Sequence, residues 1–404
     1  MSAPALRFKE FDGDWPSVPL KDFVSFRKGK GISKADIQED GTFQCIRYGE
    51  LYTTYGQVIT TIKSRTNISP SESILSQNGD VIIPASGETQ IDIATASCVA
   101  KENVILGGDL NILSHQESGE WLAYYLSSAK KLEIAQLAQG NSVVHLYSSQ
   151  LKELKVNKPT KAEQTKIASF LSAVDEKITQ LTQKHQLLSQ YKQGMMQKIF
   201  SQQIRFKADD GSEFEEWNDI QLKDISHRIT RKNKELNQNA LTISAQLGLI
   251  NQQEYFSKQI ASRDLSKYYL LHKGEYAYNK SYSAGYPMGA IKRLKLYDKG
   301  VVSTLYICFS LNEYINSDYF EQFVESGLLV PELEKIAQEG ARNHGLLNIS
   351  LQEFFEVNLK MPSLDEQAKI ANFLSAIDQK IDVVSQQIKQ AKQWKKGLLQ
   401  QMFV

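Results

Sequence analysis

Apolar residues at helical spacing predict two long helices, one in the middle of the chain and one at its end. In residues 163–199 and 366–402 the apolar side chains recur in alternating steps of four and three. A seam of this kind, held for about five heptads, is typical of a coiled coil. The packing positions that we assign to the seam are Ile167, Leu171, Val174, Ile178, Leu181 and Leu188 in the first helix, and Ile370, Leu374, Ile377, Ile381, Val384 and Ile388 in the second.

Both helices have the same predicted start. Thr160 and Ser363 stand at the N-cap position, and a glutamate follows each of them three residues later, as Glu163 and Glu366. The pattern is that of a capping box, in which the N-cap side chain accepts from the third backbone N–H and the glutamate accepts from the N-cap N–H. We therefore expect the helices to begin directly after Thr160 and Ser363.

A lysine interrupts the apolar seam at the same place in both helices. Lys192 and Lys395 fall on the seam, and an aromatic residue precedes each of them, Tyr191 and Trp394. The shared irregularity indicates that the two helices pack against each other. The alternative is that each helix packs only on its own domain.

The helices are the most similar parts of an internal repeat with a period of about 200 residues. EQTKIASFLSAVDEKI at 163–178 and EQAKIANFLSAIDQKI at 366–381 are identical at 12 of 16 positions. Near the start of each copy, Arg7-Phe8-Lys9 and Trp15 recur as Arg205-Phe206-Lys207 and Trp217. Because this period is too long for a solenoid, the sequence predicts a duplicated module of one domain and one helix.

The segments before the two helices read as mixed α/β domains that diverge from each other much more than the helices do. Predicted strands, rich in Val, Ile, Thr and Tyr, are Asp80–Pro84, Ile91–Ala100, Tyr276–Asn279, Gly289–Leu294 and Val301–Ser310, and predicted helices are Glu120–Ala138 and Asp318–Gln338. We expect a first domain at 1–158, a central helix at 159–200, a second domain at 201–361 and a terminal helix at 362–404.

The predicted fold class is therefore α/β (α+β), with two mixed α/β domains joined by two long helices. Those helices are expected to form an antiparallel coiled coil, because the chain must return and equivalent modules then close on each other. The duplication would give this arrangement pseudo-twofold symmetry.

Composition narrows the class of protein. The chain of 404 residues is 41% hydrophobic and 23% charged, as expected of a globular protein, and its net charge is only +1. No run of about 18 apolar residues and no apolar leader are seen, so we expect neither export nor membrane insertion. Cys45, Cys98 and Cys308 lie far apart, which favours a reducing cytoplasm and argues against a zinc site. A nucleic-acid surface on a nearly neutral chain must be local.

Catalytic motifs are missing from the sequence. There is no N-P-P-[YF] loop with a glycine-rich turn, as an adenine methyltransferase needs, and no G-x-x-x-x-G-K-[ST] phosphate loop, as a motor needs. Gly29-Lys30-Gly31 is too short for a phosphate loop, and Glu153-Leu154-Lys155 has no acidic partner for a nuclease site. We predict no catalytic residue and no metal site in this chain.

Polar and basic loops are the candidate DNA contacts, because phosphates are bound mainly by Lys and Arg and base edges by Arg, Lys, Asn and Gln. Such residues gather in three segments that occur at equivalent places of both copies: a basic cluster near the start, a loop after a predicted strand, and a loop after the predicted helix. In the first copy they are Arg27, Lys28, Lys30, Ser86, Thr89, Gln90, Asn141, Ser142 and His145. In the second they are Arg228, Arg231, Lys232, Lys234, Asn279, Lys280, Tyr282, Tyr286, Arg342, Asn343 and His344.

Along its whole length the chain resembles the specificity subunit of type I restriction–modification enzymes. The duplicated E-Q-x-K-I-A-x-F-L-S-A-[VI]-D helix start is the most specific feature, and IRYGELYTTYGQVI, GEYAYNKSYSAGYPMGAIKRL and GVVSTLYICF look like that family's target-recognition domains. The resemblance implies a non-catalytic, cytoplasmic subunit that binds double-stranded DNA, with one half-site per domain and a gap set by the helices. It also implies two docked adenine methyltransferase subunits and further restriction subunits, so that S-adenosylmethionine, ATP and Mg²⁺ belong to the partners and no cofactor belongs to this chain.

Two other functions fit the repeat. The first is a coiled-coil scaffold that joins two protein partners and has no role in DNA binding. The second is a two-domain enzyme with two equivalent active sites, although no acid–base pair or ligand cluster recurs in both copies.

Overall fold

A computed structural model of the chain describes residues 3–140, 143–244, 246–256, 264–283, 285–342 and 346–403. It divides into two compact units, of which unit 1 comprises Met1–Gln183 and Ser385–Val404 and unit 2 comprises Lys184–Val384. Each unit therefore holds one α/β domain together with about half of each long helix.

Unit 1 is built on a five-stranded sheet with the order β2-β10-β6-β8-β4. Its strands are β2 Ser25–Lys28, β10 Leu110–Ser114, β6 Asp80–Pro84, β8 Ser97–Val99 and β4 Val58–Ile59. Smaller sheets join β5 Ser64–Thr66, β3 Phe43–Ile46 and β9 Ile105–Leu106, pair β1 Ser17–Pro19 with β12 Lys155–Asn157, and pair β7 Ser86–Gly87 with β11 Val144–His145. The helices are α1 Glu50–Thr53, α2 Gln90–Ile93, α3 Gly119–Ser128, α4 Lys131–Leu137, α5 Ser148–Lys152 and α6 Lys161–Phe200.

Unit 2 repeats the plan with a four-stranded sheet of order β14-β21-β18-β19. Its strands are β14 Ser226–Ile229, β21 Ile307–Leu311, β18 Tyr276–Asn279 and β19 Ala290–Arg293. Four strand pairs surround it: β13 Asn218–Gln221 with β24 Asn358–Met361, β15 Leu241–Ser244 with β16 Gly248–Asn251, β17 Tyr269–His272 with β20 Lys299–Val302, and β22 Gln338–Arg342 with β23 Leu346–Asn348. The helices are α7 Leu222–Ile225, α8 Gln252–Tyr255, α9 Ser317–Glu325, α10 Leu329–Ile336, α11 Leu351–Phe355 and α12 Leu364–Met402.

The predicted strands and helices are confirmed where one pattern runs unbroken and wrong where a cap or turn interrupts it. Asp80–Pro84 and Tyr276–Asn279 form strands with the predicted bounds. The predicted strand Ile91–Ala100 is instead helix α2 followed by β8, because the Thr89 side chain accepts from the Asp92 N–H and caps a helical turn.

Three longer predicted elements are each divided in two. Val301–Ser310 contributes to β20 and β21, and Glu120–Ala138 forms α3 and α4. Asp318–Gln338 forms α9 and α10, which are separated at Gly327, whose φ of 82° is a conformation that glycine adopts without strain. A turn of two to four residues inside an apolar pattern does not change its periodicity, so the pattern alone hides the break.

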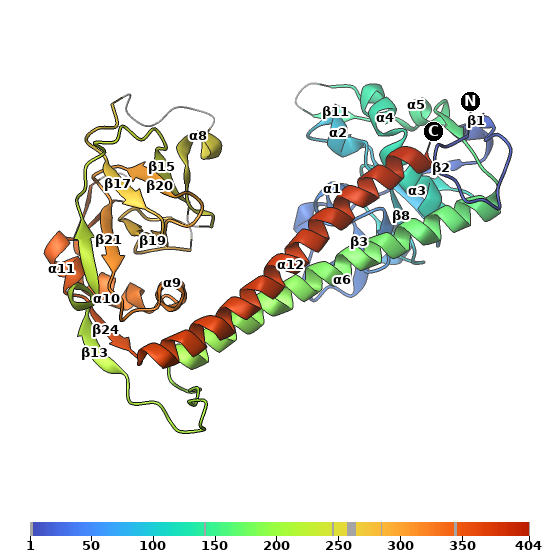
Figure 1. Cartoon of the computed structure of the whole chain (residues 1–404). Coiled ribbons are helices and arrows are strands. Elements are labelled where there is room, and N and C mark those ends of the chain that lie inside the picture. The colour runs from blue at the N-terminus through green and yellow to red at the C-terminus, as the bar shows by residue number, and fades with distance from the viewer. Residues whose placement is uncertain are drawn as a thin grey trace. The chain divides into compact units, whose positions relative to one another are not determined.

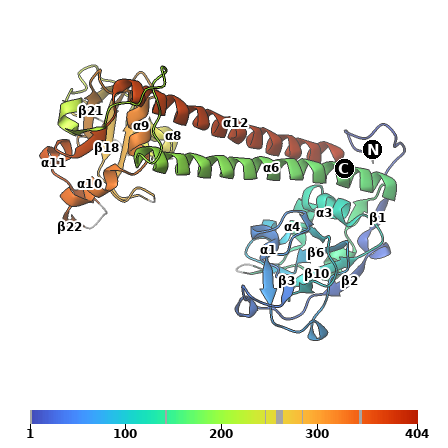
Figure 2. The ribbon, with the colours of Figure 1, turned by 90° about the horizontal axis from the view of Figure 1, so that it is seen from below.

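Within each unit the two long helices run antiparallel and lie side by side (Figure 1 and Figure 2). In unit 1 the first half of α6 packs against the last part of α12, and in unit 2 the last half of α6 packs against the first part of α12. The lysines on the seam face aspartates of the opposite helix: Lys395 Nζ lies 2.6 Å from Asp175 Oδ1, and Lys192 Nζ lies 2.7 Å from Asp378 Oδ1. The irregular seam position is therefore a cross-helix ion pair, present once in each unit.

Seam residues pack on the domains as well as on the opposite helix. In unit 1, Ile167 and Leu171 belong to the same apolar core as Leu398 of α12 and Trp121 of α3. In unit 2, Ile370 and Leu374 share a core with Ile199 of α6 and with sheet and helix residues of the domain. Packing on the domain and packing between the helices are thus not exclusive alternatives.

A buried carboxylate fastens the start of each repeat to the start of its helix. In unit 1, Glu163 accepts from Arg7 at 2.7 and 2.8 Å and from the indole N–H of Trp15 at 3.2 Å. The Glu163 side chain is only 1% exposed. An ionised carboxylate withdrawn from water needs such partners, since a buried unpaired charge costs several kcal/mol. The guanidinium responds in turn, because its bond to Glu163 raises the pKa of Arg7.

The same carboxylate contacts recur in unit 2. Glu366 accepts from Arg205 at 3.3 and 2.9 Å and from the indole N–H of Trp217 at 3.1 Å. The capping box predicted at these glutamates is therefore half confirmed. The Thr160 and Ser363 side chains do accept from the third backbone N–H, at 3.4 Å in both units, but the glutamate side chains bind Arg and Trp instead.

We predict that Glu366→Ala destabilises unit 2 by about 3–5 kcal/mol, because it leaves the Arg205 guanidinium and the Trp217 N–H without their carboxylate. Urea unfolding followed by tryptophan fluorescence measures the effect. Glu216→Gln is the matched control, since Glu216 also faces Arg205, at 3.5 Å, but its side chain is 91% exposed. The control should change stability by less than about 1 kcal/mol. Equal unfolding midpoints for the two variants would show that the buried contact does not hold the unit together.

Candidate nucleic-acid interface

In unit 1 two loops that the sequence singles out lie against each other. Ser86 of β7 pairs with His145 of β11, and the Leu146 N–H donates to the Ala85 carbonyl at 2.9 Å. The loop that follows β6 and the loop that follows α4 are thus joined by backbone hydrogen bonds. Segments more than 50 residues apart in the sequence form one polar surface at the end of β6.

Two of the predicted basic residues lie at the same end of the sheet. β2 and β6 flank β10, and Lys28 and Ile83 both pair with Asn111, so the two outer strands end at the same level. The chain then continues beside the β9–β10 turn, where the Lys30 N–H donates to the Leu106 carbonyl at 3.1 Å. Lys28 and Lys30 are exposed, and so are Thr89, Gln90 and His145. This group, which we call the sheet-end cluster, is a candidate contact to a phosphate backbone and to base edges.

Other predicted residues of unit 1 have structural partners. Arg27 forms a hydrogen-bonded ion pair with the buried Asp80, donates to the Leu75 carbonyl at 3.1 Å and lies on the edge strand β2. Ser86 is only 5% exposed. The guanidinium of Arg27 is thus occupied, and the Ser86 side chain is buried. The exposed residues of the sheet-end cluster are therefore the better candidates for contacts to DNA.

Unit 2 also brings two of its predicted segments together. The Leu347 N–H donates to the Lys280 carbonyl at 2.7 Å, and Lys280 Nζ donates to the Ile349 carbonyl at 3.1 Å. The loop that leaves β18 therefore contacts the segment around β23, as the corresponding loops do in unit 1. Asn279 is half-buried beside it, and Tyr282 is 65% exposed.

The basic cluster of unit 2 is partly neutralised. Arg231 forms an ion pair with Glu275 at 2.6 Å, and Lys232 Nζ lies 4.4 Å from the centroid of the Tyr269 ring. Arg228 and Lys234 are exposed. In this unit the two latter side chains are the clearest candidates for phosphate contacts.

Several predicted residues lie outside the described part of the chain. They are Asn141, Ser142, Asn343 and His344, and the side chain of Arg342 is likewise outside it. Their assignment as base readers stays a prediction from the sequence.

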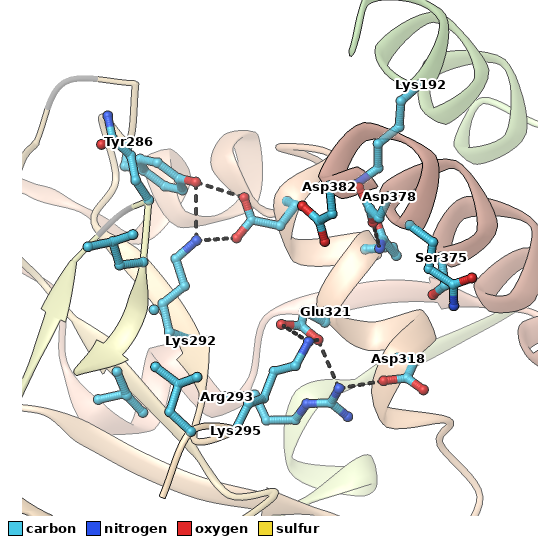
Figure 3. Close-up of a pocket in the computed structure, with 18 residues that line it drawn as sticks. Lys192, Tyr286, Lys292, Arg293, Lys295, Asp318, Glu321, Ser375, Asp378 and Asp382 are labelled. Carbon is cyan, nitrogen blue, oxygen red and sulfur yellow. Dashed lines mark hydrogen bonds and ion pairs between the residues drawn. The ribbon is translucent and has the colours of Figure 1, made fainter. Parts of the chain in front are cut away.

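A cavity of about 560 Å³ in unit 2 is lined by charges that are paired with each other (Figure 3). Lys292 binds Glu325, Arg293 binds Asp318 and lies 2.9 Å from Glu321, and Lys192 binds Asp378. Tyr286, predicted as a DNA contact, points into this cavity and donates to Glu325 at 2.7 Å. Since each of these cations already has a carboxylate partner, the cavity does not have the excess positive charge that a phosphate would require.

The three cysteines of the chain are buried. Burial raises the pKa of the Cys45 thiol to about 11 and that of Cys98 and Cys308 to about 12, which keeps all three protonated near neutral pH. No group of three or more His, Cys, Asp and Glu with the geometry of a metal site occurs among the described residues. None of the helices in that part of the chain is long and apolar enough to cross a membrane.

Sequence reasoning missed the residues that bind the seam lysines. Asp175 accepts from Tyr124 at 2.6 Å and Asp378 accepts from Gln322 at 2.8 Å, so an α3 or α9 side chain joins each cross-helix ion pair. One signal was present: each aspartate lies inside the nearly identical helix start, 17 residues before the lysine of its own helix. A charged residue repeated within an apolar pattern indicates a partner of opposite charge.

Comparison with known proteins adds a family and a fold. The sequence profile of the type I restriction modification DNA specificity domain matches residues 12–190 and again residues 214–393. The type I restriction enzyme MjaVIII specificity subunit of Methanocaldococcus jannaschii is 25% identical over 230 residues, which are 54% of this chain and 52% of that protein. The chain thus spans about half the length of this curated relative.

Two solved structures share the fold. The crystal structure of a type I restriction–modification S subunit from M. genitalium has a TM-score of 0.62 and 16% identity, and the match covers 100% of this chain and 99% of that one. A structure described as showing complex assembly and conformational transition of the type I R-M system has a TM-score of 0.54 and 14% identity, with 95% of this chain and 96% of that chain covered. At these identities the similarity is one of fold alone.

We predict that Lys28→Ala with Lys30→Ala weakens binding to every DNA duplex, because phosphate contacts do not depend on sequence. If both lysines release counterions, the slope of log K against log salt should fall by about two units. Fluorescence anisotropy of a labelled duplex at several salt concentrations measures both effects. Lys101→Ala is the control, since this exposed lysine follows β8 at the opposite end of the same sheet. An equal loss in the control variant would mean that only net charge matters.

Proposed function

Because this chain belongs to the family of type I restriction modification DNA specificity domains, which match it twice over most of its length, we propose that it is the non-catalytic subunit that selects the DNA sequence for such a complex. In this proposal each domain reads one half of a bipartite site in double-stranded DNA. The observation that carries it is the recurrence of one scaffold with two different polar surfaces. Unit 1 presents the exposed sheet-end cluster, and unit 2 presents different side chains at the equivalent loops.

We further propose that the helix pair serves two purposes. It sets the gap between the half-sites, and its exposed face docks two adenine methyltransferase subunits, through which restriction subunits join. The docking role rests on large apolar side chains that are exposed on α6 and α12, namely Leu187, Tyr191, Val383 and Trp394, because exposed apolar patches mark interaction sites. S-adenosylmethionine, ATP and Mg²⁺ would then be bound by the partners, and the complex would work in the cytoplasm.

A scaffold without a role in DNA binding remains the competing function. The same exposed apolar side chains support it, whereas the polar loops at the sheet ends do not, since a scaffold that binds its partners through the helices has no need of two divergent domain surfaces. Binding of the chain to DNA in the presence of its methyltransferase separates the two. A scaffold would leave the affinity of the methyltransferase for every duplex unchanged.

We predict that the two domains read independently. Replacing residues 1–158 by the corresponding domain of a related subunit with another specificity should change one half of the methylated motif and keep the other half. The donor must keep the equivalents of Arg7 and Trp15, because these side chains bind Glu163 of the retained helix. Sequencing of methylated adenines in cells that carry the chimera and its methyltransferase identifies the motif. A folded chimera that loses both half-site preferences would contradict independent reading.

We predict that lengthening both helices widens the gap between the half-sites. Seven residues inserted after Gln183 in α6 and seven after Gln386 in α12 keep the phase of the seam and add about 10.5 Å, at about 1.5 Å per residue. With about 3.4 Å per base pair, the unspecified gap should grow by about three pairs. Reduced affinity is also expected, since three pairs rotate the far half-site by about 100°.

The same seven residues inserted between Asp209 and Asp210, in the loop after α6, form the control, because they lengthen the chain but not the helices. The methylated motif of that variant should keep its original gap. An active variant with longer helices and an unchanged gap would mean that the helix pair does not measure the distance.

A further inference from the structure

Each unit has a cleft at the same place in the repeat, between a long helix and the end of the domain helix that packs on it. The unit 1 cleft, of about 460 Å³, lies between α12 and the end of α3, and the unit 2 cleft, of about 240 Å³, lies between α6 and the end of α9. Equivalent residues line them: Lys392, Lys395, Lys396, Leu399, Gln400 and Ser128 in unit 1, and Ser189, Lys192, Gln193, Met196, Gln197 and Ser326 in unit 2.

The two clefts have a similar apolar lining. Leu399 and Phe403 give the unit 1 cleft an apolar floor, and Met196 and Ile381 do the same in unit 2. Gln400 corresponds to Gln197 at the rim. A partner segment that presents an apolar side chain to one cleft therefore finds a similar surface in the other.

The charges of the two clefts differ. Lys392 and Lys396 of unit 1 are replaced by Ser189 and Gln193 in unit 2, where Glu325 lines the cleft instead. Within the described residues neither Lys392 nor Lys396 forms an ion pair, and both are exposed.

The net charges of the two clefts still differ when the ion-pair partners of the lining residues are included. Lys395 is bound to Asp175, so the unit 1 cleft carries three lysines and one aspartate. In unit 2, Lys192 is bound to Asp378 and Glu325 to Lys292, which leaves no net charge (Figure 3). The unit 1 cleft thus has an excess of two positive charges over its counterpart.

We propose that the unit 1 cleft binds an acidic segment of the methyltransferase, and that the equivalent segment of a second methyltransferase copy binds the unit 2 cleft more weakly. This inference rests on the proposed function, because it takes two copies of one partner as the occupants. Identical partners then meet two unequal surfaces. The complex therefore assembles in two steps, and the copy on unit 1 is bound first and more tightly.

A protein segment fits these clefts better than DNA. The apolar floors are suited to a side chain such as Leu or Phe, which a phosphate backbone does not offer. The unit 2 cleft has no net positive charge, so a phosphate backbone would gain little there from the release of counterions. Carboxylates beside an apolar side chain match the unit 1 cleft in both respects, since its two uncompensated lysines lie next to Leu399.

The test exchanges the charges between the clefts in the full-length chain. K392S/K396Q gives unit 1 the residues of unit 2, and S189K/Q193K does the reverse. Titration with the purified cognate methyltransferase subunit, followed by native mass spectrometry and calorimetry, yields the two affinities. In the unchanged chain they should differ by roughly 2- to 25-fold at low salt, as expected of two exposed ion pairs. The difference should shrink in about 0.3 M salt, where exposed charges are screened.

Each variant has its own expected result. K392S/K396Q should weaken the tighter site until the two affinities are nearly equal, and S189K/Q193K should strengthen the weaker site. The second variant gains affinity, so a folding defect cannot imitate it. Two equal affinities in the unchanged chain, or unequal ones that neither variant alters, would overturn the inference while leaving the proposed function intact.

Two further readouts separate the remaining possibilities. If the unchanged chain binds no methyltransferase, the proposed docking role fails and the inference fails with it. Anisotropy of a labelled duplex with the chain alone tests the other ligand class. If K392S/K396Q weakens DNA binding but leaves methyltransferase binding unchanged, the cleft is a phosphate contact and the inference is wrong.

Discussion

One buried carboxylate at the start of each long helix determines how the domain is held. Glu163 and Glu366 are almost completely withdrawn from water, so each needs a cation and a donor at fixed positions. Arg7 and Trp15, or Arg205 and Trp217, supply them from the first residues of the repeat. The first residues of each repeat are thus bound to the start of its long helix through one carboxylate, and the rest of the domain lies between these two points in the sequence. The scaffold can stay fixed while the rest of the domain changes.

These buried contacts belong to the part of the domain that must stay constant, whereas the polar loops are free to vary. The neighbouring glutamine extends these contacts: Gln164 and Gln367 accept from the backbone N–H at the start of α3 and α9, at 3.0 and 2.9 Å. The helix start therefore positions the domain helix as well. The exposed side chains of the polar loops of unit 1 lie at the end of strands that this framework supports, and they take no part in the buried carboxylate contacts. Substitutions there alter the surface without disturbing the buried pairs.

The features that could be predicted from the sequence are those that depend on neighbouring residues in the chain. The helix starts, the repeat and the strands β6 and β18 follow from periodicity and capping residues alone. The partner of Glu163 did not, because capping chemistry gives that side chain a plausible local bond and only the fold brings Arg7 within reach. Arg27 is a similar case, since its basic neighbours suggest a phosphate contact whereas the buried Asp80 lies beside it on the sheet. Contacts between distant segments decide which charges remain exposed.

The seam lysines likewise break a local apolar pattern because they bind residues that are distant in the sequence. A charged residue in an apolar seam lowers the stability of a helix pair but restricts its register, because only one alignment places the opposite charge beside it. Lys395 with Asp175 and Lys192 with Asp378 meet this condition in the two units. Shifting the helices by one residue would break both pairs and leave four charges half-buried. The paired residues occur in both copies, whereas Lys392 and Lys396, one turn or less away and outside the seam, have no counterpart lysines in α6. The two copies thus agree in the charges that align the helices and differ in the charges beside them.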